Sequence, residues 1–216
     1  QRQMCIRDRF TSVNNVTANR IARLHNDGNN ADGTIDGSLD ASFIASITSN
    51  DVRALVIQSN DSIVVGGLFA STNGITTNRI TRLLPNGSLD IGFNVIAATG
   101  LIGSGFNSDV RTLALQTIEG EERILVGGLF TSYNGATTAT ANLGGTITFN
   151  RILRLTSTGA VDNTFATGTG FDGDVLGLAV QSDNKVVVVG NFTTYKGGTN
   201  TANRIARLDS FGVQDS

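Results

Sequence analysis

The sequence predicts an all-β protein made of repeated antiparallel units, and three observations lead to this prediction. A phenylalanine recurs at nearly fixed distances, since Phe10, Phe69, Phe130 and Phe192 lie 59, 61 and 62 residues apart. Short runs of Val, Ile, Leu and Thr follow each of them, turn residues separate these runs, and the chain has a single proline. No stretch keeps the 3.6-residue apolar period of an amphipathic helix.

Each unit contains the same elements in the same order. After the phenylalanine comes a hairpin turn, at Asn73-Gly74, Asn134-Gly135 and Gly197-Gly198, where residue types that tolerate positive φ stand. A strand of the pattern Asn-Arg-Ile-x-Arg-Leu follows, with its first arginine at Arg20, Arg79, Arg151 and Arg204. A Gly-x-x-Asp step then ends at Asp40, Asp90, Asp162 and Asp215.

The next strand of the unit carries two apolar faces of unequal size. It reads DVRALVIQ from Asp51, DVRTLALQ from Asp109 and DVLGLAVQ from Asp174. Alternation places mostly small residues on one face (Val52, Ala54, Val56; Val110, Thr112, Ala114; Val175, Gly177, Ala179) and larger ones on the other (Leu55, Ile57; Leu113, Leu115; Leu176, Leu178, Val180). A strand with two apolar faces is buried on both, so we expect sheets that stack large face into small face.

An apolar run into glycine closes the unit, as IVVGG, ILVGG or VVVG. The second glycine of the pair recurs as Gly67, Gly128 and Gly190, whereas Val189 replaces the first glycine in the last copy. We therefore expect the second glycine to be obligatory, at a place where the backbone crowds or bulges, and the first to be dispensable.

Four short antiparallel strands in a unit of this length predict the blade of a β-propeller. The units cover about residues 10–68, 69–129, 130–191 and 192–216, which makes three full blades and part of a fourth. Since a closed ring needs about 4–8 blades, the sequence predicts an open arc or a fragment of a ring. Residues 1–9 break the pattern and are treated as a non-native-looking leader.

Composition excludes several classes of partner. The formal net charge is -2 without a basic block, so nucleic acid is not an expected partner. No apolar run approaches the roughly 20 residues that span a bilayer, so no membrane insertion is predicted. The single cysteine, Cys5, gives neither an intramolecular disulfide nor a metal cluster. The abundance of Asn, Thr, Ser and Gly favours an exported protein.

The ordered motifs GG-x-F, NG, NRI-x-RL, NGSLD, DVR-x-LALQ and VVGG, spread over residues 10–216, resemble the delta-60 repeat. The resemblance implies a bacterial β-propeller, seven-bladed when complete, within a long exported or cell-surface protein. It implies no established catalysis and supplies no ligand.

The repeated charges are the first candidate site residues. Arg20, Arg79, Arg151 and Arg204 are expected to form structural ion pairs with Asp40, Asp90, Asp162 and Asp215. The alternative is a ring of charged ligand contacts, but repetition in every unit favours the structural interpretation, since a site needs one copy.

Two further candidates concern binding. The segment NDGNNADGTID resembles a calcium loop, with Asp27, Asn30, Asp32 and Asp36 as candidate ligands. Gly28 occupies the first ligand position and no glutamate follows, so a polar loop is the alternative, and no other cofactor is predicted. Tyr133 and Tyr195 lie beside corresponding turns and are candidate contacts for a sugar or peptide, with cover for the blade edge as the alternative.

The inventory of reactive residues argues against an enzyme. His25 is the single histidine, and there is no Gly-x-Ser-x-Gly motif. Asp172 and Asp174 would suit sugar hydrolysis, but they correspond to the turn residues FNSD at 106–109. The loops 94–105 and 136–149 interrupt the period and are expected to carry binding.

The sequence therefore predicts a non-catalytic scaffold of an exported or cell-surface bacterial protein that mediates protein or glycan binding and adhesion. The alternatives are a purely structural spacer in a large surface protein, or a lyase or glycosidase acting on polysaccharide. Apolar flanks at the open ends are expected to cause self-association.

Overall fold

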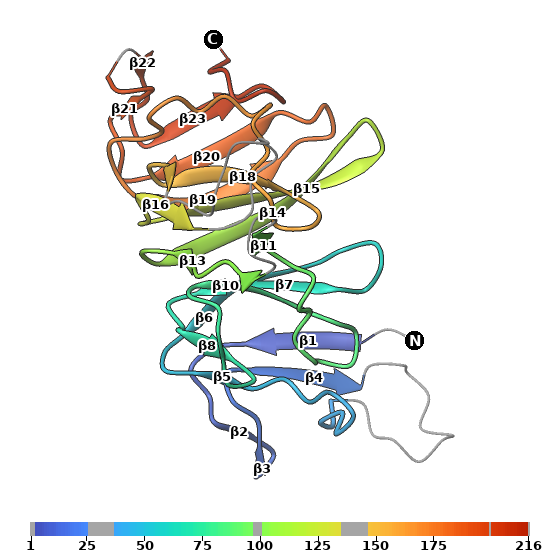
Figure 1. The fold of residues 1–216 in the computed structure, drawn as a ribbon. Helices are drawn as coiled ribbons and strands as arrows, with labels where there is room; N and C mark the ends of the chain where they lie inside the picture. The colour runs from blue at the N-terminus through green and yellow to red at the C-terminus, as the bar shows by residue number, and fades with distance from the viewer. Residues whose placement is uncertain (1–2, 26–36, 97–100, 135–146, 199, 216) are drawn as a thin grey trace.

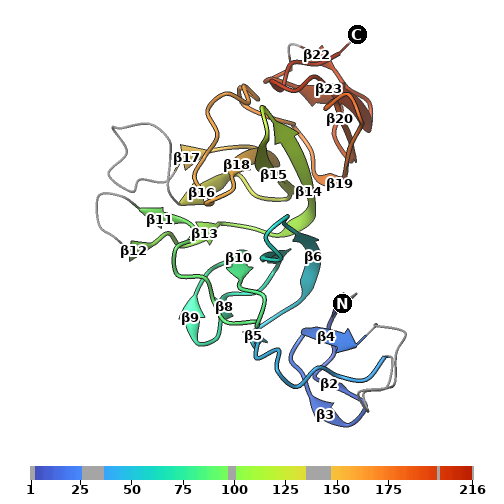
Figure 2. The same cartoon turned by 90° about the vertical axis from the view of Figure 1, so that its right-hand side faces the viewer.

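The computed structural model describes residues 3–25, 37–96, 101–134, 147–198 and 200–215, which form strands and turns without a helix. Four β-sheets, which we call blades 1 to 4 in chain order, stack beside one another from the N-terminal end at the bottom of Figure 1 to the C-terminal end at its top. The stack bends into an open arc (Figure 2). The predicted all-β propeller architecture, as an open arc, is confirmed.

Blades 2, 3 and 4 each contain an inner, a middle and an outer strand, all antiparallel. Blade 1 contains β1 (Gln3–Arg7) and β4 (Ile21–His25), and blade 2 contains β6 (Val52–Ile57), β7 (Ile63–Gly67) and β10 (Ile80–Leu83). Blade 3 contains β14 (Val110–Ile118), β15 (Glu121–Gly128) and β18 (Ile152–Thr156), and blade 4 contains β19 (Val175–Val180), β20 (Val186–Gly190) and β23 (Ile205–Leu208). The inner strands β6, β14 and β19 follow one side of the arc in Figure 2, where β14 packs between the other two.

The predicted fourth strand is reduced to a single bridge in each blade. The bridges are Leu24–Leu39, Leu83–Leu89, Leu155–Val161 and Leu208–Gln214. The chain leaves the sheet directly afterwards because the next aspartate turns it. In blade 2, for example, Asp90 Oδ1 accepts the N–H of Gly92 at 2.8 Å.

Short hairpins connect the middle strand of each blade to its outer strand. They are β2 (Ser12–Val13) with β3 (Val16–Thr17), β8 (Ser71–Thr72) with β9 (Ile75–Thr76), β16 (Ser132–Asn134) with β17 (Ile147–Thr148), and β21 (Thr194–Tyr195) with β22 (Asn200–Thr201). The segment entering blade 2 or 3 adds a strand to this hairpin, β5 (Ile47–Thr48) or β13 (Gly105–Phe106). A separate pair, β11 (Val95–Ile96) and β12 (Leu101–Ile102), lies between blades 2 and 3 in the chain.

The sheets are out of phase with the repeats of the sequence. Each predicted unit begins at its phenylalanine, whereas each full sheet begins at its inner strand and ends beyond the next phenylalanine. Residues 3–7, which the sequence sets apart as a leader, form β1 and pair along β4. This strand takes the place of a middle strand, so among the described residues the first sheet is the incomplete one, without an inner strand.

A β-bulge changes which residues share a face of the inner strand. The register shifts at Arg53 in β6, at Arg111 in β14 and at Leu176 in β19. The extra residue reverses the alternation, so Val110 and Leu113 both face blade 2. The predicted stacking of large face into small face is found, but the valine belongs to the large face.

The second glycine is obligatory because a carbonyl lies against it. A Cβ on Gly67, Gly128 or Gly190 would collide with the main-chain oxygen of Asp51, Asp109 or Asp174, respectively. This oxygen accepts the N–H of the residue after the glycine, for example Leu129 to Asp109 at 2.9 Å. The expectation that backbone crowding requires this glycine is confirmed.

The first glycine faces the next blade instead. A Cβ on Gly66 would lie 2.5 Å from Val110 Cγ1, and a Cβ on Gly127 would lie 2.6 Å from Val175 Cγ1. Val189 holds this place in blade 4, where no further blade follows among the described residues. The inner-strand valines Val110 and Val175 thus occupy the space that the missing side chains of Gly66 and Gly127 leave open.

Three hydrophobic clusters lie between successive blades. Ile21, Val52 and Phe69 belong to the first, Ile80 and Ile124 to the second, and Ile152 and Val188 to the third. The core is therefore divided among the interfaces between blades. Each blade depends on its neighbours for burial of its faces, as in other repeat proteins.

Candidate functional site

The aspartates of the Gly-x-x-Asp step pair with the second arginine of the outer strand. The pairs are Arg23–Asp40, Arg82–Asp90, Arg154–Asp162 and Arg207–Asp215, each at 2.7 or 2.8 Å. The predicted partners Arg20, Arg79, Arg151 and Arg204 are wrong. The register explains why: the N–H of Asp90 donates to the carbonyl of Arg82, so these two side chains leave the backbone as neighbours.

The first arginines shape the backbone instead. Arg20, Arg79, Arg151 and Arg204 have φ values of 65°, 67°, 67° and 64°, in the left-handed region. The N–H of Arg79 donates to the carbonyl of Phe69 at 2.9 Å, and its own carbonyl accepts the N–H of Gly67 at 3.0 Å. The other three arginines donate to Phe10, Phe130 and Phe192 in the same way. This position therefore closes the turn between hairpin and outer strand.

The second arginine also reaches the next blade. Arg154 Nη1 donates to the main-chain oxygen of Ser210 at 2.6 Å and to Gln116 Oε1 at 2.8 Å, and the guanidinium carbon lies 4.6 Å from the centre of the Phe165 ring. Arg23 donates to the carbonyl of Pro85, and Arg82 to that of Ser157, in equivalent turns. We call this contact the inter-blade staple.

Burial and pairing act in opposite directions on the carboxylates of these pairs. Burial alone would raise the pKa of Asp162, but hydrogen bonds from Thr164 and the charge of Arg154 outweigh it and hold the pKa below its ordinary value. The pKa of Asp40 is lowered in the same way, because hydrogen bonds from Ser42 and the charge of Arg23 outweigh burial. Both carboxylates are therefore charged members of the core.

A second row of charges joins the starts of the inner strands. Arg53 lies 3.1 Å from Asp51 of its own blade and 3.1 Å from Asp109 of the next, and Arg111 lies 2.6 Å from Asp109. Burial raises the pKa of Asp109 against the opposing charges of Arg53 and Arg111. These charges contact one another, which favours the structural interpretation over a ring of ligand contacts.

Tyr133 and Tyr195, the predicted ligand contacts, lie in the core with 0% exposure. The hydroxyl of Tyr133 lies 2.7 Å from Asn94 Oδ1 and from the Gly159 carbonyl, and that of Tyr195 donates to the Gly212 carbonyl at 2.7 Å. Their rings pack against Phe106 and Phe171, with centroids 4.6 and 4.5 Å apart.

Burial raises the pKa of both tyrosines above its ordinary value. The prediction of ligand contact was wrong because alternation along β16 and β21 turns each tyrosine inward, although it stands next to a turn.

The carboxylate of Asp172 is held by the hairpin of blade 4. Asp172 Oδ1 accepts the N–H groups of Thr193 and Thr194, each at 2.8 Å, and Oδ2 accepts the Thr193 hydroxyl at 2.6 Å. These hydrogen bonds lower the pKa of Asp172 far below its ordinary range. Asn107 caps the equivalent turn of blade 3 through Thr131 and Ser132, so the position is a turn cap in both blades.

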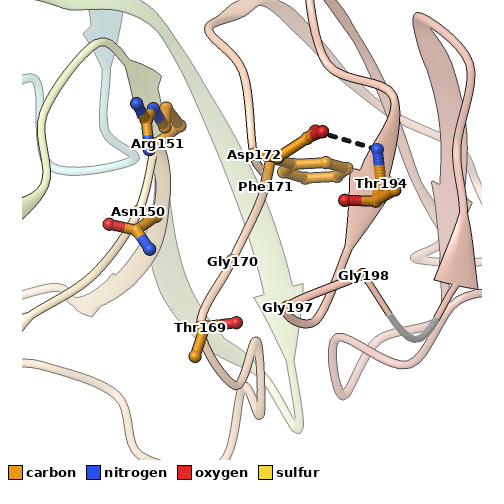
Figure 3. Close-up of a pocket in the computed structure, with 9 residues that line it drawn as sticks. All are labelled: Asn150, Arg151, Thr169, Gly170, Phe171, Asp172, Thr194, Gly197 and Gly198. Carbon is orange, nitrogen blue, oxygen red and sulfur yellow. Dashed lines mark hydrogen bonds between the residues drawn. The ribbon is translucent and has the colours of Figure 1, made fainter.

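A groove of about 410 Å³ lies beside Asp172, between blades 3 and 4 (Figure 3). Asn150 and Arg151 line one side, the segment from Thr169 to Asp172 crosses its middle, and Thr194 with Gly197 and Gly198 lines the other side. Amide, hydroxyl and guanidinium groups thus surround an open surface. No sequence pattern predicts this groove, because its sides come from separate blades.

The predicted calcium ligands Asp27, Asn30, Asp32 and Asp36 lie outside the described residues. Within the described segments, no group of three or more His, Cys, Asp and Glu side chains is placed to hold a metal ion. Cys5 is a free cysteine, and burial raises the pKa of its thiol against the charge of Arg23.

The predicted binding loops are described in part. Residues 97–100 and 135–146 lie outside the described residues. Asn94 at the start of the first loop is buried, and its Nδ2 donates to the Gly103 carbonyl at 3.0 Å. The ends of this loop are therefore fixed to the core between blades 2 and 3. The described segments contain no helix with the length and hydrophobicity of a membrane span.

Stacked antiparallel blades, repeated staples and cores between blades define a repeat protein of the β-propeller class. A family model described as "Domain of unknown function (DUF5122) beta-propeller" matches residues 9–29, 58–93, 139–165 and 181–216. These segments make up more than half of the chain, so the chain belongs to this β-propeller family. No curated protein matches it.

Proposed function

We propose that this propeller is a non-catalytic binding scaffold of an exported or cell-surface bacterial protein, and that it mediates adhesion through a protein or glycan partner. One observation carries the proposal: the repeated charged and aromatic side chains contact other parts of the propeller. Arg154 is 1% exposed and bound to Asp162, Gln116 and Ser210, and Tyr133 is fully buried. Recognition then belongs to groups outside these repeated contacts.

The groove beside Gly197 and Gly198 is the part of the described surface that fits this role. Asn150 and Thr169 offer amide and hydroxyl groups at its rim, and Thr169 is exposed. Hydroxyl-rich glycans are recognised by hydrogen bonds of this kind. Arg151 and Asp172 also line the groove, and their opposite charges leave it without a strong preference for an anion. We therefore favour a neutral glycan over an acidic one.

A glycan array tests the proposal directly. We expect the full chain to bind a neutral glycan and the double variant Asn150→Ala, Thr169→Ala to lose most of this binding. The variant Asn78→Ala is the matched control, because Asn78 holds the position of Asn150 one blade earlier. A full chain that binds no glycan or protein target, or a groove variant that binds as well as the control, would contradict this assignment.

Binding and turnover measurements also distinguish the two alternative functions, a structural spacer and an enzyme acting on polysaccharide. A purely structural spacer would bind nothing while its stability stays normal. A lyase or glycosidase would turn over polysaccharide, and the hydrogen bonds that Asp172 accepts from Thr193 and Thr194 argue against its use as an acid or base. Polysaccharide turnover that is lost in Asp172→Asn but retained in Asp183→Asn would support the enzyme instead.

A further inference from the structure

The outward flank of blade 4 has the strands that blade 2 presents to blade 3 and that blade 3 presents to blade 4. Ile80 in blade 2 and Ile152 in blade 3 are 2% and 0% exposed, whereas Ile205 at the same position of blade 4 is 62% exposed. Gln58 and Gln116 are buried, and Gln181 is exposed at their place. Arg207, whose equivalents form the inter-blade staple, has a side chain that is 45% exposed.

Two residues make this flank different from its two equivalents. Val189 stands where Gly66 and Gly127 receive the inner-strand valine of the next blade. Leu176 stands at the bulge position where Arg53 reaches Asp109 of the next blade. Gly177 lies opposite Val189 and gives it room, since a Cβ on Gly177 would lie 2.8 Å from Val189 Cγ2. The space for an incoming valine is therefore filled from within blade 4.

The other contacts to a next blade are retained. Ile205 and Arg207 are the residue types found in blades 2 and 3 at these positions. Compared with the flanks of blades 2 and 3, the flank of blade 4 therefore differs at Leu176 and Val189, where the inner strand of a next blade would begin to pack. It is the same at Ile205 and Arg207, along the outer strand. A second copy of this chain does not supply the matching surface among its described residues, because the large faces of β6, β14 and β19 are each turned toward the preceding blade and β1–β4 has no inner strand.

We infer that the flank of β19, β20 and β23 docks a further propeller blade of a distinct type, whose inner strand carries a small residue where Val110 and Val175 stand. Large apolar side chains equivalent to Leu113 and Leu178 still insert beside Val189. The docking blade needs no aspartate equivalent to Asp109, because Leu176 stands in blade 4 where Arg53 of blade 2 contacts that aspartate. Positions 176 and 189 thus act as specificity determinants for the order of blades.

An extended chain tests the inference. A second copy of residues 163–215 is joined after Asp215, which holds the position of Asp162 in the preceding blade. The added copy has threonine in place of its own Leu176, Val189 and Ile205, since terminal repeats need a polar outer face. It is made in two forms, one with its copy of Val175 kept and one with that valine changed to alanine.

Two receiving surfaces are compared. One keeps Gly177 and Val189, and the other carries Gly177→Thr with Val189→Gly, which recreates the pair Thr112–Gly127 of blade 3. Ile205→Cys in a Cys5→Ser background reports docking through the rate of thiol labelling. The unextended chain with the same cysteine gives the uncovered rate.

On the receiving surface with Gly177 and Val189, we expect the added blade that carries alanine at its position 175 to slow the labelling of Cys at position 205 at least tenfold. The added blade that keeps Val175 should give this protection only on the surface with Gly177→Thr and Val189→Gly. Equal protection by both forms on the natural surface would overturn the inference, and so would a lack of protection in all four combinations. A discrete dimer of the unextended chain, with position 205 protected, would also overturn it and assign the flank to a second copy.

Discussion

The guanidinium of Arg154 donates to the main-chain oxygen of Ser210, so an outer strand of blade 3 holds a turn of blade 4. Arg154→Ala leaves Asp162 with Arg123, 3.2 Å away, as its remaining arginine partner. We therefore expect a loss of unfolding free energy below the about 3–5 kcal/mol that follows when a buried charge loses its whole pairing. Urea unfolding measures this cost. Arg207→Ala is the matched control, for which we expect a much smaller cost, since the Arg207 side chain is 45% exposed. Equal costs would show that the staple does not stabilise the interface.

Substitution by alanine is expected to cost much more stability at position 190 than at the adjacent position 189. Gly190→Ala places a methyl group against the Asp174 carbonyl, which belongs to the backbone of the inner strand and cannot move without distorting the sheet. We expect a loss of about 3 kcal/mol or more, by the strain that overpacking produces. Val189→Ala, at a partly exposed site, should cost about 1 kcal/mol or less. Thermal unfolding of the two variants would refute the assignment if their midpoints matched.

The hydroxyl of Tyr133 is expected to stabilise the protein without contributing to recognition. Tyr133→Phe removes the buried hydroxyl whose single proton serves the Gly159 carbonyl and Asn94 Oδ1, and loss of such a buried hydrogen bond costs about 1–3 kcal/mol of unfolding free energy. Ser182→Ala at an exposed turn is the control and should be neutral. Glycan affinity should be unchanged in both variants, and a selective loss of affinity in Tyr133→Phe would restore the tyrosine as a ligand contact.

Acid should lower the free energy of unfolding in part through protonation of Asp162. Its pKa is lower in the folded chain than in the unfolded chain, so the folded state binds fewer protons and the stabilisation is present above the ordinary value near 4. It is lost as the pH falls through the lowered pKa. Asp162→Asn should therefore flatten the decline of unfolding free energy below about pH 4.

Asp109 gives the opposite sign, because its raised pKa means that the folded state holds its proton more tightly. Its contribution to stability is fully present below the ordinary pKa and is lost as the pH rises through the raised pKa, so Asp109→Asn should steepen the acid decline. Urea titrations at several pH values distinguish the two variants. If the unfolding free energy of Asp162→Asn and Asp109→Asn fell with the same slope toward acid pH, the opposite pKa shifts of the two aspartates would be contradicted.

Self-association is expected from the uncovered flank of blade 4. Leu176, Val189 and Ile205 expose apolar surface on one face, which favours reversible association that grows with concentration and lacks a fixed stoichiometry. Ile205→Thr should reduce it, whereas Ile91→Thr, at an exposed residue of a turn in blade 2, should not. Sedimentation velocity over a range of concentrations would count against this flank if both variants behaved alike.

The period and the order of motifs were enough to predict the blades, their stacking and the obligatory glycine. The bulge at Arg111 was not predictable from alternation, because one extra residue moves Val110 to the other face without changing the hydrophobic pattern. The choice between Arg151 and Arg154 as the partner of Asp162 was hidden for a related reason. Both lie near the aspartate in sequence, and only the pairing register decides between them.

The candidate site was predicted less well than the fold. Tyr133 and Tyr195 stand beside turns, and position along the chain does not reveal that their strands turn them inward. The groove between Asn150 and Thr194 depends on how two blades are placed in space. Single-sequence periodicity predicts what one blade looks like, whereas the surfaces between blades depend on long-range packing.

The sheets are out of phase with the sequence repeats, and this affects how a gene for a repeat protein of this kind can gain or lose repeats. Each full sheet draws its strands from both sides of a repeat boundary, as β7 and β10 lie on either side of Phe69. Unequal recombination between any two equivalent points adds or removes one inner, one middle and one outer strand together. Every such event therefore leaves intact sheets, and only the match of neighbouring flanks, such as Val189 with the residue that meets it, decides whether the new array is compatible.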